Sequence, residues 1–293
     1  MKPPRFDYAR PSTLSEAVAL LAAHGSEARP IAGGQSLMPM LALRLVAPRL
    51  VVDIGRIEGL DSITIARDGS VTLGALVRWR DIERHLRLQA AHPMLVAATG
   101  HIAHYAIRNK GTVGGSLAHA DPAAELPGIA VACDGEITVV GPGGARTIAA
   151  GDFFTGTLTT ALRPDELITQ LWLPAWRAER RWAFEEFARR RGDFALAGVA
   201  LFYDVDAQGC AVAPHVAAIG FADRPLRLSA VEAAITGRKT TREVIREACD
   251  VAHTGVDPDE DIHAPADYRR ALLAELTERA LARAAGLPLR EVA

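Results

Sequence analysis

Apolar and polar residues follow more than one period along this chain. Over residues 12–24 the apolar positions recur at helical spacing, Thr13 and Glu16 form a capping-box sequence, and Gly25 can end the helix. From there to residue 174, short β-rich runs alternate with short helical segments. The predicted strands are residues 29–31, 50–54, 62–65, 71–73, 137–140, 146–148 and 168–173, and the predicted helices are residues 37–43, 79–85, 93–103 and 126–133.

Beyond residue 181 the strand-like runs come first and the helical runs follow. This order indicates a separate α+β unit, and the charged segment 175–181 is the predicted linker to it. Its predicted strands are residues 184–187, 197–205 and 212–221, and its predicted helices are 230–236, 242–253 and 265–285. We expect one domain at residues 1–174, with subdomains of about 1–55 and 56–174, and a C-terminal α+β domain at 180–288.

Composition narrows the class of protein without naming a function. The 293 residues suffice for two domains, 49% of them are hydrophobic, and the formal net charge is −2. With aromatic residues at only 5%, this balance argues against a nucleic-acid partner. No apolar run reaches the roughly 18 to 20 residues of a membrane span, and residues 1–10 lack an apolar signal region. We expect a soluble, cytoplasmic protein.

Cysteine and histidine spacing predicts no metal site on this chain. Cys133, Cys210 and Cys249 are far apart and none lies in a C-x-x-C motif, so neither a zinc site nor an iron–sulfur cluster is expected here. An odd, sparse set of cysteines also suits a reducing compartment. His101 and His104 are three residues apart on a predicted helix, which is metal-ligand spacing, but no third ligand is evident nearby.

The strongest chemical signal is a pair of glycine-containing segments. The first reads Ile31-Ala32-Gly33-Gly34-Gln35-Ser36-Leu37, and the second reads Gly111-Thr112-Val113-Gly114-Gly115-Ser116-Leu117. Glycine lets a ligand approach the backbone closely, and successive N–H groups in such turns bind anions. Two of them in one chain suggest a clamp on a diphosphate, although either alone could be an ordinary tight turn. Neither is a P-loop or a G-x-G-x-x-G fingerprint, which disfavours a nucleoside triphosphate or a Rossmann-bound nicotinamide.

The surroundings of the second segment carry a family resemblance. Ile107-Arg108-Asn109-Lys110 precedes it, and His119-Ala120-Asp121-Pro122-Ala123-Ala124-Glu125-Leu126-Pro127 follows. Together with the first segment and Arg190-Arg191-Gly192-Asp193-Phe194-Ala195, these motifs resemble the FAD-binding medium subunit of the molybdenum hydroxylases, the xanthine dehydrogenase and carbon monoxide dehydrogenase family. The motifs match the family in order and spacing, and the likeness covers essentially the whole chain.

The resemblance implies an α+β fold: a vanillyl-alcohol-oxidase-type FAD-binding domain of two subdomains, followed by a C-terminal domain of the CO dehydrogenase flavoprotein type. It also implies an oxidoreductase subunit that passes electrons from [2Fe-2S] clusters on a partner subunit through non-covalent FAD to an external acceptor. The partners implied are an iron–sulfur small subunit and a molybdenum-cofactor large subunit, in a dimer of heterotrimers. Both cofactors of those partners are expected on separate chains, and an exposed apolar patch is expected where the iron–sulfur subunit docks.

The resemblance also assigns the FAD contacts by position, with no catalytic residue and no metal ligand on this chain. The glycine segments would cradle the pyrophosphate through backbone amides and three hydroxyl groups, two acids would accept hydrogen bonds from sugar hydroxyls, and two isoleucines would make apolar contacts. The predicted residues are Pro30, Ile31, Ala32, Gly33, Gly34, Gln35, Ser36, Leu37, Ile102, Gly111, Thr112, Val113, Gly114, Gly115, Ser116, Asp121, Glu125 and Ile168.

One position departs from the family pattern. Several members of the family place a lysine where this chain has Glu186. A cation near the flavin stabilises the reduced, anionic form and a carboxylate opposes it, so the flavin potential is expected to differ. We do not assign Glu186 as an FAD ligand.

Two other classes of function remain open from the sequence. The chain could be a stand-alone FAD oxidase or reductase, which would need a base beside the flavin that we cannot identify. It could also be a flavin-free assembly protein, against which the intact Gly33-Gly34 and Gly114-Gly115 pairs speak. The substrate of the whole enzyme and its electron acceptor are not determined by these residues.

Overall fold

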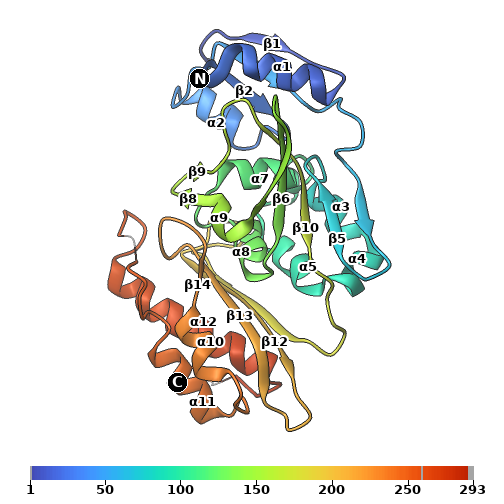
Figure 1. Ribbon diagram of the computed structural model, residues 1–293. Helices are drawn as coiled ribbons and strands as arrows, with labels where there is room; N and C mark the ends of the chain where they lie inside the picture. The colour runs from blue at the N-terminus through green and yellow to red at the C-terminus, as the bar shows by residue number, and fades with distance from the viewer. Residues whose placement is uncertain (1, 259, 290–293) are drawn as a thin grey trace.

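Three β-sheets follow one another along the molecule from the N-terminal to the C-terminal part of the chain. The computed structural model describes residues 2–258 and 260–289. The first sheet lies at one end, the second in the middle and the third at the other end, each with its own helices (Figure 1). The predicted α+β fold class is confirmed by this mixture of sheets and helices.

The first sheet is parallel and is covered by one helix. Its strand order is β1 (Asp7–Ala9), β3 (Leu50–Asp53), β2 (Ala28–Ile31). Helix α1 (Leu14–His24) begins with the predicted capping box, because the Thr13 side chain accepts from the Glu16 amide and the Glu16 carboxylate accepts in return. The short helix α2 (Leu37–Ala42) follows β2. The end of β2 therefore delivers the first glycine segment directly to α2.

The second sheet is antiparallel and supports the second glycine segment. Its order is β4-β5-β10-β6-β7, so the strand that comes last in sequence lies in the centre. The sheet shares one core with several helices. The strands are β4 (Ile63–Ile65), β5 (Val71–Gly74), β10 (Leu167–Leu173), β6 (Glu136–Gly141) and β7 (Gly144–Ala149), and the helices are α3 (Trp79–Arg84), α4 (Leu86–Ala91), α5 (Pro93–Thr99), α7 (Val113–His119) and α8 (Glu125–Ala132).

The third sheet is buried on both faces. Alternate residues such as Ala183 and Leu201 pack against the C-terminal helices, whereas Phe184 and Ala200 pack into the core of the second sheet. This alternation follows from the two-residue period of a strand. The elements are β11 (Arg181–Phe187), β12 (Ala197–Val205), β13 (Ala211–Ile219), β14 (Leu226–Arg227), α10 (Ser229–Ile235), α11 (Arg242–Asp250) and α12 (Ala266–Ala284).

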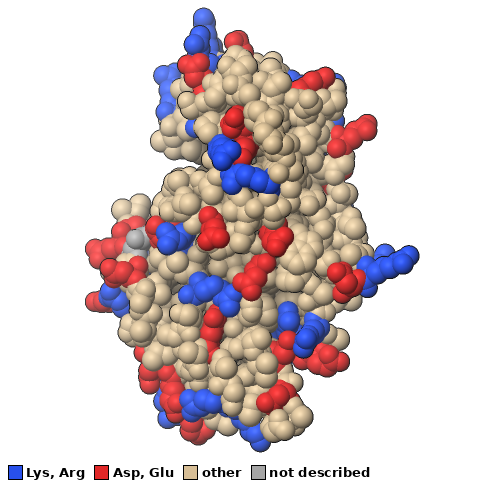
Figure 2. Space-filling model, in the orientation of Figure 1, with Lys and Arg blue, Asp and Glu red and all other residues tan. Residues whose placement is uncertain are grey.

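The remaining elements are short. They are η1 (Gly25–Glu27), α6 (Tyr105–Arg108), α9 (Ala150–Phe153), β8 (Phe154–Gly156) and β9 (Thr159–Thr160). In the described part of the chain, no helix combines the length and hydropathy needed to cross a lipid bilayer. Charges of both signs are interspersed on the face shown in Figure 2.

Several predicted boundaries were wrong, and a histidine cap explains why one helix was missed. The helix predicted over residues 93–103 ends at Thr99, and α4 was not predicted at all. His85 and His92 cap α4 and α5, since the Nδ1 atom of each accepts from the backbone amide three residues later. Histidine is not among the residues that favour this position, so the pattern carried no start signal. The helix predicted over residues 242–253 ends at Asp250.

The segment between the second and third sheets is held by aromatic rings. Trp176 lies against His92 at a ring-centroid distance of 4.7 Å and against Phe202 at 5.2 Å. The Arg180 guanidinium lies over both the Trp176 and Phe202 rings and forms an ion pair with Asp204. The predicted linker is thus packed onto the two units that it joins.

A buried arginine fixes α12 to the third sheet. Arg269 is 5% exposed, and its guanidinium donates to the carbonyl oxygens of Leu196 and Gly220 and pairs with Asp261 at 2.9 Å. The Gly220 amide in turn donates to the carbonyl of Pro122, just before α8, at 2.8 Å. One side chain therefore links the C-terminal helices to the contact with the middle sheet.

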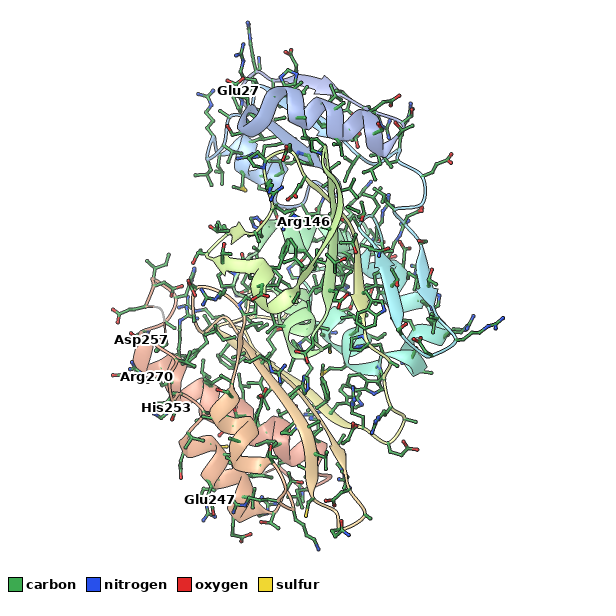
Figure 3. All side chains as sticks on the ribbon, in the orientation of Figure 1. Glu27, Arg146, Glu247, His253, Asp257 and Arg270 are labelled. Carbon is green, nitrogen blue, oxygen red and sulfur yellow. The ribbon has the colours of Figure 1, made fainter. Side chains whose placement is uncertain are left out.

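We predict that Arg269→Ala lowers the free energy of unfolding by about 2 to 4 kcal/mol, because two carbonyl groups lose their donor. Urea denaturation measures this loss. Arg270→Ala is the matched control, since Arg270 lies beside Asp257 at the surface and pairs with it and with Asp267 (Figure 3). Such exposed pairs contribute less than about 1 kcal/mol. Equal losses in the two variants would contradict the anchoring role of Arg269.

Candidate FAD site

The two glycine segments contact each other through their backbones. A methyl group at Gly33 would lie 2.1 Å from the carbonyl oxygen of Lys110 and 3.0 Å from the Cα of Gly111. No side chain larger than hydrogen fits at such a separation. The predicted convergence of the segments is therefore present.

The first segment presents a row of backbone donors. Within the described part of the chain, the amides of residues 32–37 donate no hydrogen bond to the protein. Gly34 has φ of +70°, a conformation that glycine adopts without strain, and the Gln35 side chain donates to the carbonyl of Gly33 at 2.8 Å. Successive free N–H groups of this kind attract anions. The segment can therefore take the negatively charged part of a ligand.

The second segment is the start of a helix rather than a free turn. Thr112 caps α7, and its Oγ1 accepts from the Gly115 amide at 3.1 Å. The amides of Val113 and Gly114 donate to the carbonyls of Val77 and Ala75 at 2.9 and 2.8 Å. The expectation that both segments offer their amides to the ligand thus applies to the first segment. The second one is docked onto residues 75–77, which accept from two of its amides, and most of its other amides donate to Ile107, to the Thr112 cap or within the helix.

The remaining donors of the second segment are the Thr112 amide and two hydroxyl groups. Within the described residues, neither the Thr112 amide nor the Ser116 hydroxyl has a hydrogen-bond partner, and the Thr112 hydroxyl is free to donate while it accepts from Gly115. Ser36 offers a further hydroxyl from the first segment, again with no partner among the described residues. These groups suit phosphate or sugar oxygens.

The other predicted residues lie along the elements that follow. Asp121 comes just after α7, and its Oδ1 accepts from the Ala123 amide at 2.9 Å. Ile168 is buried on β10, next to Thr169, whose carbonyl accepts from the Ala75 amide at 2.9 Å. Ile102 is half-buried after α5 and packs against the same core. Asp121 and Ile168 therefore lie on or beside elements that contact α7, whereas Ile102 lies after α5.

Glu125 is the first residue of α8 and is 9% exposed. Burial raises its pKa to about 7, and the nearby Asp121 carboxylate adds to the rise. A carboxyl group that is half neutral at pH 7 can both accept and donate a hydrogen bond. This suits the predicted role opposite sugar hydroxyl groups.

Glu186, which the sequence analysis did not assign as an FAD ligand, interacts with Glu125 in the structure. It lies on β11 on the face that packs against the middle sheet, and its Oε2 is buried without a hydrogen-bond partner. Burial raises the pKa of Glu186 to about 8, and the charge of Glu125 contributes to the rise. The only signal in the sequence was the exchange of a lysine for an acid; nothing local showed that its Oε2 atom would be buried.

The histidines considered as metal ligands do not lie on a helix. His101 and His104 fall in the bend between α5 and α6, where His101 contacts the Phe184 ring and His104 lies against Gly192. Among the described residues, no group of three or more His, Cys, Asp or Glu side chains is placed to hold a metal ion.

Known families account for nearly the whole chain. A family model described as FAD binding domain in molybdopterin dehydrogenase matches residues 4–176, and one described as CO dehydrogenase flavoprotein C-terminal domain matches residues 182–284. The chain belongs to the FAD-binding medium subunits of the molybdenum hydroxylases. The expected family, the cofactor FAD and the assignment as an oxidoreductase subunit are confirmed.

Members of this family with different named reactions are similarly close to the chain. It is 36% identical to the carbon monoxide dehydrogenase medium chain of Hydrogenophaga pseudoflava over 96% of this chain and 97% of that one. It is 37% identical to the nicotine 6-hydroxylase medium subunit of Paenarthrobacter nicotinovorans, over 97% and 99%. A chain in the crystal structure of quinoline 2-oxidoreductase from Pseudomonas putida 86 is 34% identical, with a TM-score of 0.92 over 98% of this chain and 99% of that chain.

We predict that Gly33→Ala lowers FAD affinity by at least about ten-fold. The added methyl group pushes the first segment off Lys110, and loss of one hydrogen bond to a charged group costs about 1.5 to 3 kcal/mol. The flavin absorbance per chain after gel filtration measures the loss. Gly151→Ala is the control, because a methyl group there meets no atom within 4 Å. Full flavin retention by Gly33→Ala would refute the proposed backbone contact as part of the FAD site.

Proposed function

We propose that this medium subunit passes electrons from [2Fe-2S] clusters on a partner subunit through FAD to an external acceptor. The observation that carries the proposal is the contact of the two glycine segments beside a row of free backbone amides. A diphosphate is the part of FAD that such donors suit. We assign FAD binding to residues 1–174 and a separate C-terminal domain to residues 180–288.

Different groups of residues would bind different parts of FAD, according to their chemistry. The free amides of residues 32–37 and the hydroxyls of Ser36, Thr112 and Ser116 would hold the pyrophosphate and neighbouring oxygens. Asp121 and Glu125 would meet sugar hydroxyls, and the buried Ile168 and half-buried Ile102 would exclude water from the ring system. Bound FAD supplies the redox chemistry, and the protein supplies binding, orientation and electrostatics.

The proposed partners are an iron–sulfur small subunit and a molybdenum-cofactor large subunit, in a dimer of heterotrimers in the cytoplasm. The named relatives are medium chains or subunits, which supports assembly with other chains. They are named for different reactions, on carbon monoxide and on nicotine, although the medium chains are similar. Substrate choice is thus proposed to lie in another subunit.

Exposed apolar side chains next to the first glycine segment suit the docking of a partner. Met38, Leu43 and Leu45 are 43%, 53% and 69% exposed, and all three lie on α2 or directly after it. Large apolar groups in water favour burial at an interface. We propose this α2 patch, defined by these three residues, as the contact with the iron–sulfur subunit.

Purification of the chain from its native source tests the function as a whole. We expect a flavin spectrum together with the iron–sulfur absorbance of a bound partner, and a mass well above that of the chain alone. A lone, fully active flavoprotein would indicate a stand-alone oxidase or reductase instead. A colourless protein would indicate a flavin-free assembly protein.

We predict that Leu45→Glu reduces the amount of iron–sulfur subunit that co-purifies with the chain while flavin bound per chain is retained. A charge in an apolar contact is desolvated without a partner, which weakens association. Leu86→Glu serves as control, because Leu86 is 85% exposed on α4, on the other side of the view from α2 (Figure 1). If both variants bind the partner as well as wild type, the α2 patch is not the interface.

A further inference from the structure

Glu186 lies in a row of residues that crosses three strands on one face of the third sheet. It is paired with Gly198 on β12, and Gly198 is paired with Ile219 on β13. Residues opposite one another in an antiparallel sheet point to the same face. Ile219 belongs to the core of the middle sheet, so this face, with Glu186 on it, is turned toward the FAD-binding domain.

Helix α8 brings Glu125 to the same contact. A methyl group at Gly128 would lie 2.4 Å from the Cγ2 of Ile219, which shows how closely the helix lies on that row. Glu125 is three residues before Gly128, about one helical turn away and on the same side of the helix. The backbone bond from the Gly220 amide to the carbonyl of Pro122 fixes the approach.

The charged groups around the two carboxyls do not neutralise them. In the described residues, neither Glu125 nor Glu186 has a basic side chain within 4.0 Å, and the Oε2 of Glu186 is buried without a partner. Asp121 adds a third carboxyl near Glu125. From the other elements, His101 contacts Phe184 on β11, and Arg191 lies near His101 and favours its neutral form.

Glu185, the neighbour of Glu186, shows that only one face of β11 carries an acid without a basic partner. Glu185 points to the opposite face of β11, where it pairs with Arg283 at 2.6 Å. The buried Glu166 is likewise matched, by Arg146 at 2.7 Å. Two carboxylates buried together without a cation repel each other, so one of them keeps its proton.

We propose that Glu125 and Glu186 hold one proton between them where α8 lies on the third sheet, and that this carboxyl pair takes up a further proton when the flavin site gains negative charge. The second part rests on the proposed function. The proton comes from solvent and forms an O–H bond with a carboxylate oxygen of the pair, so the charge of the site rises by one. Added negative charge nearby raises the proton affinity of a carboxylate, which couples the two events.

Infrared difference spectra of the full chain, with and without FAD, test the first part. At neutral pH we expect the carbonyl band of a protonated carboxyl group, which weakens in Glu186→Gln, where Glu125 alone can hold a proton, and disappears in Glu186→Lys. Lysine would form an ion pair with Glu125 and remove the reason for holding a proton. Glu185→Gln should keep the band. A wild-type spectrum without the band, or a band that survives both substitutions at residue 186, would overturn the shared proton.

The pH dependence of unfolding is a second, independent measure. In the folded chain the pKa values of Glu125 and Glu186 are about 7 and about 8, above the ordinary glutamate value of 4.5 that applies to the unfolded chain. Between pH 4.5 and pH 8 the folded chain therefore binds more protons than the unfolded chain. The stability contributed by the protonated pair is present below pH 4.5 and is lost as pH rises through 7 to 8. Glu186→Gln should therefore lose less thermal stability than wild type over that rise. Identical losses would contradict the pair.

Redox titration of the bound FAD against pH tests the coupling. We expect the midpoint potential to fall more steeply with pH in wild type than in Glu186→Gln, with Glu185→Gln following wild type. Equal slopes in wild type and Glu186→Gln would overturn the coupling even if the infrared band is present. A chain that binds no FAD would instead refute the proposed function and leave the infrared and unfolding results to decide the pair.

Discussion

The backbone contact between Gly33 and the carbonyl of Lys110 joins two parts of the chain that belong to different sheets. The first glycine segment is the exit of a parallel sheet and the second is the start of a helix on an antiparallel sheet. Because both meet through main-chain atoms, their separation is set by the sheets behind them rather than by adaptable side chains. A ligand that bridges the two segments therefore meets a preformed site.

The two segments contribute in different ways because they are bonded differently. The first leaves its amides free, so it can receive negative charge. The second satisfies two amides on residues 75–77 and most of the others within its own helix, cap and preceding turn, which makes it a rigid support that offers one amide and two hydroxyls. The second segment is held by the core of the middle sheet, whereas the first segment extends from the separate core of the first sheet.

The third sheet places a further acidic residue, Glu186, on the face that is turned toward the FAD-binding domain. Since both of its faces are buried, every second residue of β11 is placed against the FAD-binding domain whatever its charge. Hydrophobic residues such as Phe184 fit there readily, whereas Glu186 is half-buried, with its Oε2 atom buried and without a hydrogen-bond partner. An acid kept in such a place carries a desolvation cost that its protonation relieves.

The amino-acid sequence by itself determined the features that depend on neighbours a few residues away. The capping box at Thr13, the hairpins, the long α12 and the glycine motifs with their family resemblance all belong to this group. The tertiary structure alone decided that Gly33 touches Lys110, that the second glycine segment opens a helix, and that Glu125 and Glu186 lie at one contact. Capping, turn formation and periodicity act over one or two turns of backbone, whereas these contacts depend on how whole sheets pack and on the water that their packing excludes.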